Sequence, residues 1–101
     1  MRLECARDVV LFEVESRVVG WEEIARECQS KRDDVRVASP DRRVHSVLVL
    51  PPTRRHRELV AAHQHLVAAA FPARSAVLEE APRSGQSDWP GDGLLWVAGR
   101  G

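Results

Sequence analysis

Residues 9–14 read VVLFEV and residues 44–50 read VHSVLVL, and these two runs decide the fold. Each run is apolar and rich in β-branched residues, which is typical of a strand buried on both faces of a sheet. Between them, residues 21–32 repeat apolar side chains at helical spacing. Residues 33–43 are polar without a clear period, and we expect them to connect the helix to the second run. A strand, a helix and a strand in this order predict an α/β fold with the two strands parallel.

The later segments extend this alternation of strands and helices. Thr53 is a good N-cap for a long helix that we expect to end near Phe71. Residues 75–78 are expected to form a short third strand, and residues 94–98 a last strand or an extended edge segment. Residues 81–93 are rich in Gly, Pro, Ser and Asp, which predicts a loop. We therefore expect a small mixed, mostly parallel sheet with β-α-β-α-β order.

Size and composition limit the classes of protein to consider. We interpret residues 1–101 as one α/β domain. Fifteen basic and fifteen acidic residues cancel, so any binding of anions has to come from a local cluster. Cys5 and Cys28 are too few for a disulfide framework and are expected to be buried free thiols. No signal peptide and no apolar run of membrane-spanning length is recognisable, so we expect a cytoplasmic protein with no membrane partner.

Two glutamates form the first candidate site. Glu13 and Glu15 lie two residues apart at the end of the first apolar run, and such spacing on a strand predicts that both face the same side. Two such carboxylates can hold Mg²⁺ together with waters and phosphate. Lys31 would reach this site only from the following helix. The alternative is a solvated strand end at which the glutamates pair with Arg17.

The second candidate site is the basic start of the long helix, which consists of Thr53, Arg54, Arg55, His56 and Arg57. The N-terminus of a helix carries free N–H groups and a partial positive charge, so basic side chains there are unfavourable without an anion. Helix N-termini bind phosphate, and ligands of open α/β sheets gather beyond the carboxyl ends of the strands. The alternative is neutralisation by nearby acids such as Glu58, Asp33 and Asp34.

Three pieces of the chain resemble a known family. They are RDVVLFEVESR at residues 7–17, WEEIARECQSKRDD at residues 21–34 and SVLVLPPTRRHRELVAAHQHLVAAAFP at residues 46–72. Together they resemble the C-terminal domain attached to many bacterial helix-turn-helix regulators of the phage-repressor type. That domain has the topology of the restriction-endonuclease-like superfamily, so the resemblance implies part of that fold.

The resemblance also implies roles for particular residues. The superfamily's catalytic pattern has an upstream Asp, an acidic residue and a Lys two positions further on. Glu13 matches the acidic residue, but Glu15 stands where the Lys would be, and Lys31 resembles a Lys relocated to the following helix. Asp8 is too close to Glu13 to match the upstream Asp. The resemblance therefore implies a fragment that lacks an upstream helix-turn-helix domain.

Three hypotheses about function remain open at this point. The first is a non-catalytic regulatory or nucleic-acid-associated module of a transcription regulator, which needs no cofactor and contacts phosphate through its Arg-rich helix start. The second is a metal-dependent nuclease that uses Glu13, Glu15 and Lys31 with Mg²⁺. The third is a dimerisation or structural domain that forms a homodimer. We adopt the first, because the expected Lys is missing from the nuclease pattern.

Overall fold

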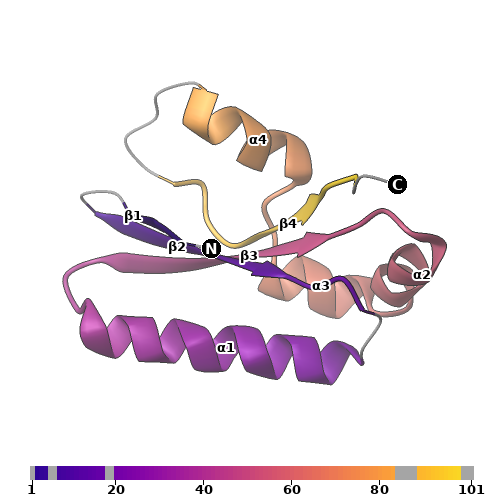
Figure 1. Cartoon of the computed structure of the whole chain (residues 1–101), viewed down its shortest axis with the longest axis horizontal. Coiled ribbons are helices and arrows are strands. Elements are labelled where there is room, and N and C mark those ends of the chain that lie inside the picture. Colours follow the sequence, from indigo (N-terminus) through magenta and orange to yellow (C-terminus); the bar gives the residue numbers. More distant parts are fainter. Residues whose placement is uncertain (1, 5–6, 18–19, 84–88, 99–101) are drawn as a thin grey trace.

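The computed structural model describes residues 2–4, 7–17, 20–83 and 89–98, which build a four-stranded sheet of order β1-β2-β3-β4 (Figure 1). Strands β2 (Asp8–Val14) and β3 (Arg43–Leu50) pair in parallel, which confirms the pairing expected of the two apolar runs. Strand β4 (Gly93–Trp96) lies parallel to β3. Strand β1 (Arg2–Glu4), which the sequence did not indicate, pairs antiparallel with β2 and makes the sheet mixed.

Helices cover both faces of this sheet, and the molecule measures 38 × 29 × 25 Å. Figure 1 shows α1 (Trp21–Ala38), α2 (Arg54–Ala62) and α3 (Gln64–Ala70) on one side and α4 (Ser75–Arg83) on the other. The described order is thus β-β-α-β-α-α-α-β, which differs from the expected β-α-β-α-β.

The two faces of the sheet bury separate hydrophobic clusters. On the first face, Leu48 and Leu50 of β3 pack with Ile24 of α1 and with Val67 and Phe71 from the α3 region. On the second face, Val10 of β2 and Val47 of β3 pack with Leu78 of α4. The partly buried residues Phe12, Val49, Trp89 and Leu95 lie against this cluster. A strand buried on both faces needs apolar residues at every position, which explains the continuous runs in β2 and β3.

Helix α1 is longer than the sequence analysis expected. It continues through residues 33–38, which were assigned to a polar connection. Asp33 supports this extension because its carboxylate accepts a hydrogen bond from Gln29 at 2.7 Å and pairs with Arg36 at 3.7 Å. The helix ends before Pro40, since a residue that precedes proline is disfavoured in helical conformation.

The long helix expected from Thr53 to Phe71 is two helices, because the helical conformation is interrupted at His63. The His63 ring Nδ1 donates to the carbonyl oxygen of Leu59 at 3.0 Å, while its backbone N–H donates to Val60 instead. The same ring stacks on Trp21 of α1, with centroids 6.4 Å apart. This tertiary contact holds His63 outside the helical ladder, and α3 turns away from α2.

The third strand expected at residues 75–78 is wrong, because this segment begins helix α4. Its apolar run is short, and runs of this length do not distinguish a strand from a buried helical turn. Among the α4 side chains that the structure describes, Leu78 enters the core. The loop expected at residues 81–93 is likewise corrected: residues 81–83 belong to α4, residues 84–88 lie outside the described residues, and Gly93 begins β4.

Candidate functional site

Thr53 and His56 fix the start of α2. The Thr53 hydroxyl accepts a hydrogen bond from the backbone N–H of His56 at 3.2 Å, as an N-cap does. The His56 ring Nε2 donates to the carbonyl oxygen of Arg17 at 3.3 Å. A carbonyl only accepts, so Nδ1 is left to accept from the Thr53 hydroxyl at 2.6 Å. His56 is 1% exposed, so it lies inside the protein, whereas the sequence placed it among the anion-binding residues.

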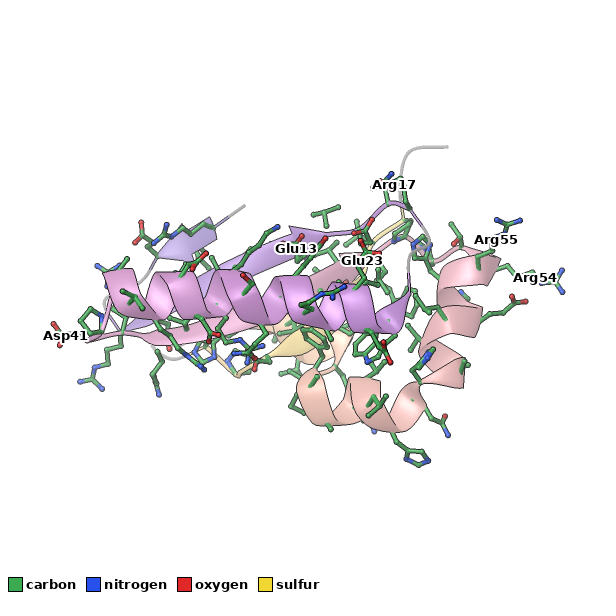
Figure 2. All side chains as sticks on the ribbon, turned by 90° about the horizontal axis from the view of Figure 1, so that it is seen from below. Glu13, Arg17, Glu23, Asp41, Arg54 and Arg55 are labelled. Carbon is green, nitrogen blue, oxygen red and sulfur yellow. The ribbon has the colours of Figure 1, made fainter. Side chains whose placement is uncertain are left out.

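The bond from His56 to Arg17 brings a fourth arginine to this end of the molecule. The segment after β2 passes the start of α2, and Figure 2 shows Arg17, Arg54 and Arg55 at the same end. Sequence reasoning missed this role of Arg17, although one signal pointed to it. Arg17 closely follows one strand and the α2 arginines follow its parallel neighbour, and parallel strands end at the same edge of a sheet.

The three arginines of α2 are exposed and differ in their partners. The Arg54 side chain is 92% exposed and pairs with Glu58 one turn further on, at 3.0 Å. Arg57 donates to the carbonyl oxygen of Pro52 at 3.3 Å, and its guanidinium lies 5.6 Å from the ring centroid of Trp96. Arg55 has no ion pair or hydrogen bond with any side chain that the structure describes. An exposed i,i+4 pair contributes only about 0.3–0.5 kcal/mol, so Glu58 neutralises Arg54 weakly.

The charge at the start of α2 is opposite to that at the start of α1. The first turn of α1 carries Glu22 and Glu23, which offset the positive end of its helix dipole. The first turn of α2 contains no acidic residue. The helix dipole and the arginines there both favour a negative ligand.

The structure brings together two of the three residues of the glutamate site. Lys31 Nζ lies 2.7 Å from both carboxylate oxygens of Glu13. Its hydrogen bond to Glu13 raises the pKa of Lys31, and the Glu13 charge adds to this effect. Glu15 is not part of the pair, since its carboxylate accepts from the backbone N–H of Arg17 at 3.3 Å.

These donors do not fit Mg²⁺. The ammonium group of Lys31 occupies both oxygens of Glu13, and Glu15 bonds within its own turn. Asp8 belongs to the opposite face, because positions 8 and 13 of β2 differ by an odd number of residues. No group of three or more His, Cys, Asp or Glu side chains in the described residues could hold a metal ion.

A buried carboxylate that the sequence analysis did not assign lies at the other end of β2 and β3. The Asp8 side chain is 1% exposed and accepts from His45 at 2.8 Å and from Arg43 at 3.0 Å. The backbone N–H of Trp89 donates to the same carboxylate at 3.3 Å. Burial alone would raise the pKa of Asp8, but the hydrogen bonds from His45 and Trp89 and the charge of Arg43 outweigh it and lower the pKa.

Cys28 shows no sign of a nucleophilic role. Cys28 lies on the buried face of α1, and this burial, together with the Glu13 charge, raises the pKa of its thiol to about 11. The thiol therefore stays protonated at neutral pH and acts as a small apolar core residue. It is a buried free cysteine, as expected, and Cys5 lies outside the described residues.

No family model, curated protein or solved structure matches this chain. In the part of the chain that the structure describes, no helix has the length and apolar character needed to cross a bilayer.

Proposed function

We propose that this domain is a non-catalytic, nucleic-acid-associated regulatory module that contacts backbone phosphate at the start of α2. The observation that carries the proposal is a helix start with three exposed arginines and no acidic residue in its first turn. Arg55 is the residue expected to contribute most, since neither Glu58 nor Trp96 engages it. The buried ring of His56 supports the site indirectly by holding Arg17 beside it.

Thermal unfolding in phosphate tests this site. At constant ionic strength, replacing chloride by phosphate should raise the melting temperature, because a ligand of the folded state stabilises it by about 1.4 kcal/mol at ten times its dissociation constant. In Arg55→Gln, phosphate should no longer raise the melting temperature. This variant should also be more stable than the wild type without phosphate, by a few tenths of a kcal/mol, because a charge that opposes the dipole is gone.

Arg26→Gln is the matched control. Arg26 is an exposed arginine on α1, away from the first turn of that helix, so its loss changes net charge equally and leaves the α2 start intact. The control should keep the full phosphate gain. If phosphate raises the melting temperature of both variants equally, it binds without specificity for the start of α2. If phosphate does not raise the melting temperature of the wild type, the proposal loses its basis.

Neither alternative function has comparable support. The pair of Lys31 and Glu13 is what a nuclease hypothesis would build on, but the glutamates do not converge on a Mg²⁺ site. The large exposed apolar side chains among the described residues come from different segments of the chain, with none adjacent to another in sequence: Leu3, Val14, Val37, Leu66, Val77 and Val97. Single exposed apolar residues are common on monomeric proteins.

A further inference from the structure

A groove of about 440 Å³ opens beside β4, between α3 and the start of α4. Val67, Phe71 and Trp96 are among the apolar residues that line it. Its polar lining consists of Gln64, Arg74 and Ser75, and none of the described residues that form its walls is acidic. An apolar cleft of this size with a few polar groups is typical of a binding site for a small molecule.

The groove is continuous with the arginines of α2. Trp96 borders it and also lies under the guanidinium of Arg57. Val60, which follows Arg57 by nearly one helical turn, lines the same groove. Trp96 is half-buried, so part of its surface is open to a ligand. A ligand that reaches from the helix start past Trp96 therefore meets cations first and an apolar cleft next.

We infer that this groove takes an unstacked base of a single-stranded nucleic acid whose phosphates contact the α2 arginines. The inference rests on the proposed function and names the form of nucleic acid that the domain binds. A base has a flat apolar face and a polar edge, and proteins bind single strands by combining aromatic side chains with a basic track along the backbone. The arginines and the acid-free lining supply the matching charge. A duplex keeps its bases stacked and cannot fill the groove.

Two oligonucleotides of equal length separate the base from the backbone. One is a short oligothymidylate, and the other carries abasic sites throughout, so both offer the same phosphates. Binding is measured by fluorescence anisotropy at low salt. The base-bearing oligonucleotide should bind about 5- to 150-fold more tightly, which is the effect of stacking one base on an aromatic side chain.

Ala68→Phe narrows the groove without touching the arginines. Ala68 is exposed on α3 and lines the groove, whereas Ala69 is exposed on the same helix and does not line it. Ala68→Phe should bind both oligonucleotides with the affinity that the wild type has for the abasic one. Ala69→Phe should keep the wild-type preference for the oligothymidylate. Sedimentation velocity on both variants shows whether the groove instead holds a second copy of the chain.

The outcomes separate this inference from the proposed function. If the wild type binds both oligonucleotides equally and Arg55→Gln weakens that binding, the groove does not bind a base, but the phosphate site at the start of α2 is supported. Absence of binding to either strand would overturn both. The wild type could instead self-associate, with Ala68→Phe abolishing this association and leaving oligonucleotide binding unchanged. That result would identify a second copy of the chain as the occupant of the groove and would overturn the inference.

Discussion

Asp8 holds three parts of the chain together through one buried carboxylate. In the sheet register it lies opposite Arg43, and its partners come from β3 and from the segment before β4. A buried charge is tolerated only when it is paired and hydrogen-bonded, and Asp8 meets both conditions. The sequence could not reveal this role, because Arg43 and His45 become its neighbours only after β2 and β3 align.

Replacing Asp8 with Asn should lower the free energy of unfolding by about 2 kcal/mol at neutral pH, because hydrogen bonds to a charged group are lost. Asp41→Asn is the control, since Asp41 is exposed and projects into solvent at one end of the molecule (Figure 2). Urea denaturation measures both values. An Asp8→Asn protein as stable as Asp41→Asn would show that the buried charge contributes nothing.

The same carboxylate predicts how stability depends on pH. The pKa of Asp8 is lowered on folding, so its contribution is present above the ordinary carboxyl pKa and is lost as pH falls through the folded value. The wild type should therefore lose more stability than Asp8→Asn in strongly acidic solution. An identical acid response in the two proteins would contradict this assignment.

Elements with a clear local pattern were predicted, whereas elements with a short or polar pattern, or that depend on distant contacts, were not. The apolar runs of β2 and β3 and the start of α1 follow from short-range patterns. The break at His63 depends on stacking with Trp21, which lies far away in the sequence. Strand β1 is three exposed residues long, so it carries no hydrophobic pattern that would mark it.

Strand β4 depends on the absence of a side chain at Gly93. A Cβ atom there would lie 2.6 Å from the carbonyl oxygen of Ala73 and 2.7 Å from Leu78 Cδ1. Because the nearest atom is backbone, Gly93→Ala should destabilise the fold by about 2–3 kcal/mol. Gly20→Ala, whose Cβ would meet nothing within 4 Å, should cost at most about 1 kcal/mol as a poorer N-cap. Thermal unfolding distinguishes them, and equal losses would mean that β4 can move away from α4.

At the scale of the whole molecule, a neutral chain concentrates its positive charge locally. The sequence identified the arginines of α2 and placed them after a strand, and the geometry adds Arg17 through His56. What the sequence could not supply is the surface around them, since the groove joins α2, α3, α4 and β4, which are separated along the chain. Neutral net charge leaves little long-range attraction, so binding should depend on a few local contacts and show a modest salt dependence set by their number.

The most direct test of the phosphate site is the salt dependence of binding to a short single strand. The logarithm of the association constant falls linearly with the logarithm of salt concentration, by about 0.7 for each phosphate neutralised on a single strand. Wild-type protein should give a slope that corresponds to two or three contacts. Arg55→Gln should reduce that slope by about 0.7, and Arg26→Gln should leave it unchanged. Equal slopes in the wild type and Arg55→Gln would contradict the claim that the start of α2 binds phosphate.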